Sequence, residues 1–287
     1  MDPRIQQIIR MIPLLRDGPV VVTPLEGGLT NRNLLLTRNE HRLVLRLAGE
    51  NSSLLGINRH TEHRCACTAA SAGIGAEVIA FFPEHEALVT RFLEGPVLTP
   101  DDVRRPATLR RVVSSLRRFH EGSPVPGRFC VFETVRSYYQ LAQARPVVFP
   151  SELAGALETF ARIERDLESE DLRWPCHNDL LPSNFVDDGA TVRILDWEYS
   201  GMGDRFFDLG NLAANNLFED AEESMLLELY FGEIRPGHQP RLRRMRLASD
   251  LREAMWGFLQ TGISTLAFDY GDYGRRHLER FLARSQR

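Results

Sequence analysis

The stretch CHNDLLPSNFVDDGATVRILDWEYSGMGDRFFD, residues 176–208, carries the pattern that decides the fold. Asn184 follows Asp179 by five positions, and Asp196 ends a later apolar run. A turn at 187–189 separates two apolar runs, which read as buried strands joined by a hairpin. Burying an unpaired carboxylate is costly, so the polar side chains at the ends of these strands should bind cations or hydrogen-bond partners.

The spacing of these residues matches the phosphoryl-transfer template of protein kinases. In that template one Asp accepts the proton of the substrate hydroxyl, an Asn five residues later binds magnesium, and an Asp after a hairpin binds the metal ions that bridge the nucleotide phosphates. The pattern predicts Asp179 as the general base that positions the acceptor hydroxyl, with Asn184 and Asp196 as Mg²⁺ ligands. A hydrolytic metal site that includes His177 is the weaker alternative, because no further histidine nearby completes a zinc-type ligand set. His177 is expected to bond the backbone of the loop.

Three segments resemble the choline/ethanolamine kinases, within the larger group that includes aminoglycoside phosphotransferases and thiamine kinases. They are HNDLLPSN (177–184), LDWEYSGMGD (195–204) and FDLGN (207–211). The resemblance implies a bilobal protein-kinase-like α+β fold, with a small antiparallel β-sheet lobe over 1–94 and a mainly helical lobe over 95–287. It also implies transfer of the γ-phosphoryl group of ATP to choline or a similar amino alcohol, with Mg²⁺ as cofactor. Asp208 is expected to hydrogen-bond the catalytic loop.

A glycine turn between the first two predicted strands is a candidate for phosphate binding. Gly27 and Gly28 would let the backbone approach phosphate oxygens closely, and Thr30 and Asn31 follow them. The same residues would also suit a plain hairpin turn. Their position upstream of a kinase-like core favours the phosphate site.

Arg46 stands on the third predicted strand, where the protein-kinase template carries a lysine. Choline kinases also tend to use arginine there, so Arg46 is expected to hold the α- and β-phosphates as a planar fork. Arg42 lies on the same face of an ideal strand and leaves the choice open. Glu62, on the following predicted helix, stands where the family's helix glutamate pairs with the strand cation, and Arg59 or Arg64 could be its partner instead.

Phe92 and Leu93 end the first lobe and are apolar enough to flank an adenine base, although core packing would explain them equally well. Ser151 is expected to cap a helix. Apolar periodicity predicts the other elements. The predicted strands are 20–23, 33–37, 42–47, 77–81 and 87–92, and the predicted helices are 4–15, 56–72, one starting at 99–102, 107–120, 132–144, 151–169 and 240–266.

The C-terminal part resembles the family segment in which aromatic side chains surround a quaternary ammonium group. Such a cation has no N–H donors, so ring faces and nearby carboxylates must hold it. Two departures from the family pattern are Glu253, where a second tryptophan would fall, and Asn215, at an acidic position; the binding site is therefore thinner or adapted to a different amine. The candidate acceptor-binding residues are Glu198, Tyr199, Trp256 and Tyr273.

The 287-residue chain has a formal net charge of −4, which gives no electrostatic case for binding nucleic acid. Its start lacks a signal-peptide core, and no apolar run is long enough to span a membrane, so a cytoplasmic location is expected. The expected partner is a small cationic alcohol, and a homodimer stays open.

Two rival functions stay open. One is another small-molecule kinase, acting on thiamine, ethanolamine or an aminoglycoside; an aminoglycoside pocket should be rich in carboxylates, whereas the C-terminal segment offers mainly aromatic residues. The other is a nucleotide-binding pseudokinase with a scaffolding role. Such proteins tend to lose the base or the metal ligands, and Asp179, Asn184 and Asp196 are all present.

Overall fold

The structure is a computed structural model that describes residues 2–16, 18–25, 31–49, 51–167 and 172–286. Gly27, Gly28 and Thr30, predicted to contact phosphate, lie outside the described residues. The N-terminal part contains α1 (Pro3–Met11), η1 (Pro13–Leu15), β1 (Val21–Leu25), β2 (Asn31–Arg38), β3 (His41–Ala48), η2 (Ser52–Leu55), α2 (Arg59–Ser71), β4 (Val78–Phe82), η3 (Pro83–His85) and β5 (Ala87–Arg91).

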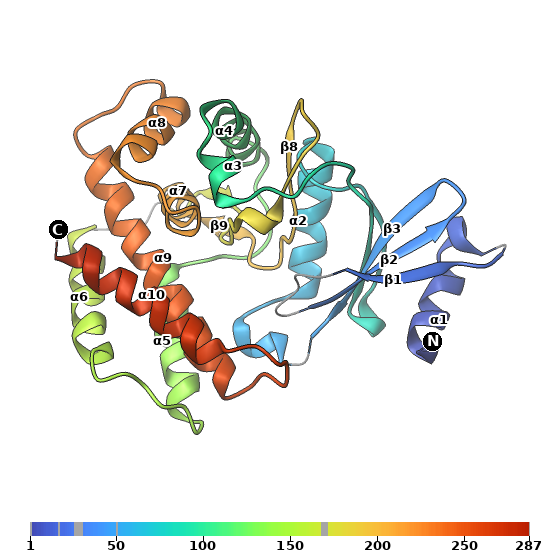
Figure 1. Ribbon diagram of the computed structural model, residues 1–287, viewed down its shortest axis with the longest axis horizontal. Helices are drawn as coiled ribbons and strands as arrows, with labels where there is room; N and C mark the ends of the chain where they lie inside the picture. The colour runs from blue at the N-terminus through green and yellow to red at the C-terminus, as the bar shows by residue number, and fades with distance from the viewer. Residues whose placement is uncertain (1, 17, 26–30, 50, 168–171, 287) are drawn as a thin grey trace.

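The five strands form one antiparallel sheet in the order β1-β2-β3-β5-β4. Side chains alternate between the two faces of a strand, so Leu43, Leu45 and Leu47 of β3 share one face, where they join a buried cluster with the isoleucines of α1. Arg46 therefore points to the other face. Helix α2 packs on that face, and Figure 1 shows α1 and α2 on opposite sides of the sheet.

The rest of the chain is mainly helical and contains α3 (Pro100–Arg104), α4 (Pro106–His120), α5 (Val131–Gln143), α6 (Leu153–Asp166), β6 (Trp174–Cys176), η4 (Pro182–Asn184), β7 (Phe185–Asp187), β8 (Val192–Ile194), β9 (Gly201–Gly203), α7 (Arg205–Asn215), α8 (Asp220–Phe231), α9 (His238–Thr261) and α10 (Tyr270–Ser285). Strands β7 and β8 pair antiparallel, which confirms the predicted hairpin. The predicted α+β class, a sheet followed by helices, is confirmed (Figure 1).

Some predicted element boundaries are wrong. Helix α6 begins at Leu153, and Ser151 does not cap it, because its hydroxyl donates to the carboxylate of Glu152 at 3.1 Å. Helix α9 ends at Thr261, with Gly262 as its C-cap residue, rather than continuing to 266. Helix α7 was not predicted. Residues 206–215 are all buried, so the helix has no polar face, and its sequence shows no alternation of polar and apolar residues with a helical period.

Helices α9 and α10 approach each other at two glycines. A Cβ atom built on Gly257 would lie 2.8 Å from the Gly274 nitrogen and 2.9 Å from the Tyr270 oxygen. The absence of side chains at both positions lets the two backbones touch. Because Trp256 and Tyr273 are their chain neighbours, the crossing brings these two aromatic side chains together.

One hydrogen bond joins the N-terminal part to the loop between α9 and α10. Asn51, just before η2, donates its Nδ2 to the carbonyl oxygen of Ile263 at 3.2 Å. No helix within the described residues combines the length and the apolar composition needed to cross a membrane.

Candidate active site

The loop after β6 is held by a buried aspartate of α7. Asp208 accepts hydrogen bonds from the backbone N–H groups of His177 (2.8 Å) and Asn178 (2.6 Å), and from the ring of His120 at 2.9 Å. Asn178 has a left-handed backbone with φ 67°, and its side chain donates to the carbonyl oxygen of Tyr199 at 3.0 Å. A non-glycine residue in this conformation is strained and must be held by its surroundings. The contacts of Asp208 are those expected from the sequence.

His177 links the loop after β6 to the residues after β8 through both of its ring nitrogens. Nε2 lies 2.8 Å from the carbonyl oxygen of Leu195, and Nδ1 accepts from the backbone N–H of Asp179 at 3.2 Å. Burial lowers the pKa of His177, which keeps the ring neutral. With both nitrogens occupied, His177 has no free lone pair for a metal ion, which argues against the hydrolytic metal site.

The three polar residues of the central motif converge. Asn184 donates its Nδ2 to the carbonyl oxygen of Asp179 at 2.9 Å, and its own carbonyl oxygen accepts from Leu195 N at 2.8 Å. Asp196 follows directly, with a left-handed backbone at φ 62°. Such strain is typical of functional positions. Asp196 therefore lies beside the loop of Asp179 and Asn184, because the β7–β8 hairpin reverses the direction of the chain between them.

Arg46 and Arg59 organise a buried network of carboxylates. Arg46 pairs with Glu62, and with Asp196 at 2.9 Å. Arg59 lies 2.8 Å from Glu62 and 3.1 Å from Glu198. Of the three partners considered for Glu62, Arg46 and Arg59 share it. We call Arg46, Arg59, Glu62, Asp196 and Glu198 the arginine–carboxylate network.

Glu198 lies in this network rather than beside the aromatic residues near the C-terminus. Its Oε2 accepts from Arg59 at 3.1 Å and from Asn31 Nδ2 at 2.9 Å, and Arg46 lies 3.7 Å away. Asn31 also accepts from Arg59 at 3.1 Å, so it joins the same network at the start of β2. Arg42, the other candidate cation of β3, instead stacks on the ring of Phe92 at 4.1 Å and pairs with Glu94.

The site carries more carboxylates than guanidinium groups among the described residues, and burial shifts their ionisation. Burial raises the pKa of Asp179 to about 8, against the lowering effect of Arg252. Burial, with repulsion from Glu198, raises the pKa of Asp196 to about 6. Burial also lowers the pKa of Arg46. A bound cation would favour the ionised form of both carboxyl groups and so lower their pKa values.

The donor set around Asn184 and Asp196 fits a magnesium ion. Because the Asn184 amide nitrogen donates to Asp179, its Oδ1 is the atom that can bind a cation. Asp196 uses Oδ1 for Arg46, and its side chain is 29% exposed. Amide and carboxylate oxygens are the hard ligands that Mg²⁺ prefers, with water and phosphate oxygens completing the set.

The residues around Tyr199, Trp256 and Tyr273, which we call the acceptor side of the site, include some that the sequence pattern did not single out. Arg252 of α9 donates Nη1 to Asp179 at 3.1 Å, pairs with its neighbour Glu253, and lies 4.3 Å from the ring centroid of Tyr199. Glu253 in turn accepts from the hydroxyl of Tyr273 at 2.8 Å. The sequence marked Glu253 only as a departure from the family, and nothing in it marked Arg252.

Three aromatic residues meet beside Glu253. The Trp256 ring makes edge contacts with Tyr270 and Tyr273, at centroid distances of 5.6 and 5.5 Å. Trp256 and Tyr273 were predicted to lie together, and Tyr270 was not. The helical spacing of Tyr270 and Tyr273 on α10 is the signal that could have identified it.

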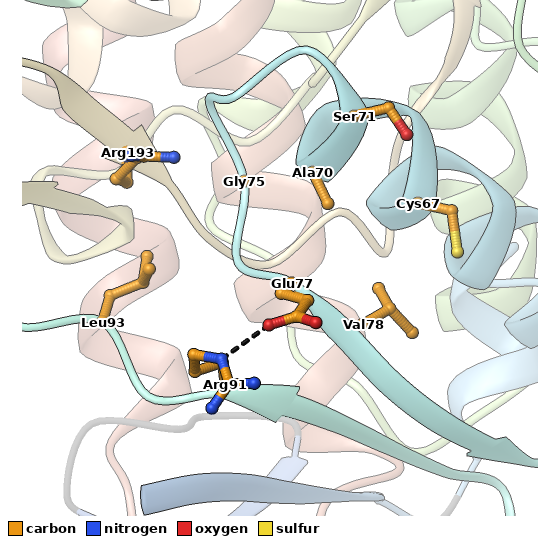
Figure 2. A pocket seen from close by; sticks show the side chains of 9 residues that line it. All are labelled: Cys67, Ala70, Ser71, Gly75, Glu77, Val78, Arg91, Leu93 and Arg193. Carbon is orange, nitrogen blue, oxygen red and sulfur yellow. Dashed lines mark hydrogen bonds and ion pairs between the residues drawn. The ribbon is translucent and has the colours of Figure 1, made fainter.

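A separate pocket of about 520 Å³ lies between the end of α2, β4 and the β7–β8 hairpin (Figure 2). Leu93 and Arg193 line it, and Arg91 and Glu77 form an ion pair of 2.6 Å at its wall. Neither Arg46 nor Asp179 is among its lining residues. It is therefore distinct from the cluster of catalytic candidates, and of the two residues proposed to flank adenine only Leu93 lines it.

Substitution of Gly257 by alanine is expected to destabilise the protein by about 1–3 kcal/mol and to raise KM for the acceptor. The added methyl group would meet backbone atoms of α10 and push Trp256 away from Tyr273. Thermal unfolding and acceptor titration measure the two effects. Gly155→Ala in α6 is the matched control, because a Cβ there meets nothing within 4 Å; it should leave KM unchanged. Equal behaviour of both variants would contradict the packing argument.

Comparison with known proteins places these features in context. The family described as choline/ethanolamine kinase matches residues 22–222. Protein LicA of Haemophilus influenzae is 28% identical over 266 residues, which cover 88% of this chain and 76% of LicA. Probable choline kinase 1 of Arabidopsis thaliana is 26% identical over 306 residues, covering 92% of this chain and 86% of the plant protein.

Among solved structures, a choline/ethanolamine kinase family protein from Mesorhizobium loti is similar over nearly the whole chain. The TM-score is 0.84 at 30% identity, covering 99% of this chain and 94% of the other. This likeness confirms the predicted bilobal kinase-like fold.

Proposed function

Because this chain belongs to the choline/ethanolamine kinase family, we propose that it transfers the γ-phosphoryl group of ATP to the hydroxyl of a small amino alcohol of the choline and ethanolamine type. The observation that supports this most is the convergence of Asp179, Asn184 and Asp196 beside Arg46. Phosphoryl transfer requires a group that receives a proton, oxygen ligands for a cation and a cationic side chain for the phosphate oxygens. These residues supply all three.

In this proposal, Asp179 accepts the proton of the acceptor hydroxyl as its oxygen attacks the γ-phosphorus. Arg46, held by Glu62 and Asp196, presents its guanidinium to the nucleotide phosphates. Asn184 and Asp196 would hold magnesium, which supplies charge neutralisation at the phosphate oxygens when it is bound. Catalysis then consists of positioning and electrostatic stabilisation, with the reacting groups fixed by the rigid loop that Asp208 anchors.

The proposal divides the chain by role. Residues 1–94 would bind the nucleotide, with Gly27, Gly28 and Thr30 as the residues proposed for phosphate and with Phe92 and Leu93 proposed for adenine. Residues 95–287 bind the acceptor and carry the catalytic loop. The protein would act in the cytoplasm on a free small molecule, and a homodimer is compatible with this role.

A coupled assay of ADP release tests the function. Choline, ethanolamine, thiamine and kanamycin are compared as acceptors in the presence of MgATP. We expect stimulation by the amino alcohols. Stimulation by thiamine or kanamycin alone would show that the protein is a kinase for a different class of small molecule. ATP binding without stimulation by any acceptor would overturn the proposal in favour of a scaffold.

Asp196→Ala is expected to remove turnover, because it deletes the proposed metal carboxylate. Chelation of magnesium by EDTA should reduce wild-type turnover to the same background. Titration of Mg²⁺ in the assay measures both effects. Asp188→Ala is the control, since Asp188 lies at the exposed hairpin turn and pairs with Arg193. Turnover by Asp196→Ala with an unchanged Mg²⁺ requirement would contradict the assigned ligand.

A further inference from the structure

The acceptor side of the site holds a buried ion pair, Arg252–Glu253, to which the proposed reaction assigns no role. Arg252 is 1% exposed and Glu253 is 3% exposed, both on the face of α9 that also carries Trp256. Charged side chains are rarely buried at this level unless they are paired or functional. We propose that this pair selects amino alcohols whose ammonium group keeps at least one N–H, a proposal that rests on the amino alcohol kinase activity above.

The first argument concerns the ring of Tyr199. A quaternary ammonium has no hydrogen-bond donor, so it needs several open ring faces to replace its hydration. The guanidinium of Arg252 already lies over one face of Tyr199, at 4.3 Å from the ring centroid. The same guanidinium is fixed by Asp179 and Glu253, so it stays on that face. One ring face that a trimethylammonium group would need is thereby covered.

The second argument concerns Glu253, which places a carboxylate among aromatic rings. Glu253 and Trp256 are three residues apart on α9 and share one side of the helix. Tyr273 contacts both, with its hydroxyl 2.8 Å from Glu253 and its ring 5.5 Å from that of Trp256. A carboxylate in a dry site gains most from a cation that can donate hydrogen bonds to it. An ammonium with at least one N–H satisfies this requirement, and a fully methylated one does not.

The third argument is the separation between Glu253 and the candidate base. One nitrogen atom, Arg252 Nη1, contacts Glu253 and also lies 3.1 Å from Asp179. The two carboxylates therefore lie within a few ångströms of each other. An acceptor with its hydroxyl and its ammonium on adjacent carbon atoms can reach Asp179 with the first and Glu253 with the second.

The test is a methylation series assayed with the wild-type enzyme. Ethanolamine, N-methylethanolamine, N,N-dimethylethanolamine and choline differ only in the number of N–H donors and methyl groups. We expect kcat/KM to fall at least about tenfold at the last methylation, which removes the final N–H. Choline used as well as ethanolamine, or better, would overturn the selectivity while leaving the proposed function standing. No turnover of any member would instead overturn the proposed function.

Two substitutions locate the selectivity. Glu253→Gln keeps the size of the side chain and removes its charge. It should lower kcat/KM for ethanolamine about tenfold or more and lower kcat/KM for choline less. Arg252→Met uncovers the ring of Tyr199 and should raise the choline-to-ethanolamine ratio. The ratio is the readout because a general loss of folded protein lowers both activities equally.

The matched control is Glu223→Gln, which breaks a second buried ion pair of α9. Glu223 of α8 pairs with Arg246, and both side chains are 3% exposed, so the loss of charge is comparable. This variant should lower stability and leave the acceptor ratio unchanged. If Glu253→Gln shifts the ratio no more than Glu223→Gln does, the pair is structural and the inference is wrong.

Discussion

Asp179→Asn is expected to lower kcat about 10²–10⁴-fold while the protein stays folded. The asparagine keeps the shape of the side chain but cannot take the proton of the acceptor hydroxyl. Arg252 retains its other carboxylate partner, Glu253, so the substitution leaves no unpaired guanidinium. Single-turnover measurements at saturating MgATP and acceptor would show the loss. A variant with near wild-type kcat would remove Asp179 from its proposed role.

The stability of the same variant gives an independent control. Burial raises the pKa of Asp179 to about 8 in the folded protein, against about 4 in an unfolded chain. Folding therefore favours the protonated form, and this contribution is complete below about pH 4 and lost as the pH rises through about 8. Without magnesium, the wild-type Tm should fall over this window more steeply than that of Asp179→Asn. Parallel profiles would contradict the raised pKa.

Arg46→Met is expected to destabilise the fold by about 3–5 kcal/mol and to weaken nucleotide binding strongly. The substitution leaves Glu62 and Glu198 with Arg59, and it removes the arginine that pairs with Asp196 among the described contacts. Arg46→Lys should recover only part of the loss, because an ammonium cannot contact two carboxylates as a planar fork. Urea unfolding and the KM for ATP measure the two effects.

Arg42→Met is the matched control on the same strand. Arg42 is 41% exposed and pairs with Glu94, which is 71% exposed, so the pair contributes roughly 0–1 kcal/mol. Its removal should change the KM for ATP little. If both arginine variants lost the same stability, the buried network would not be what holds β3 against α2.

The central motif could be predicted because its chemistry is local. Asp179 and Asn184 precede the β7–β8 hairpin and Asp196 follows it, so this short hairpin brings the three residues together. The two-residue periodicity of β3 also placed Arg46 on the face opposite the leucines. It did not separate Arg46 from Arg42, since both share that face; only the structure shows that Arg46 pairs with Asp196 of the central motif and Arg42 with Glu94.

The partners of Glu198 and the pair on α9 could not be predicted, for two different reasons. Glu198 binds Arg59, 139 residues away in the chain, and no local pattern reveals such a contact. Arg252 and Glu253 lie in a segment, 245–260, that is almost entirely buried. A helix without a solvent face gives no amphipathic period, so its charged residues read as surface positions although they are not.

The hydrogen bond from Asn51 to Ile263 is a contact that the two sides of the proposed reaction share. Asn51 precedes η2 and α2, whose Glu62 holds Arg46, while Ile263 follows the helix that carries Glu253 and Trp256. A substrate that tightens this contact when it binds would favour the binding of the other substrate. Linkage then requires that ATP raise the affinity for the amino alcohol by the same factor by which the amino alcohol raises the affinity for ATP.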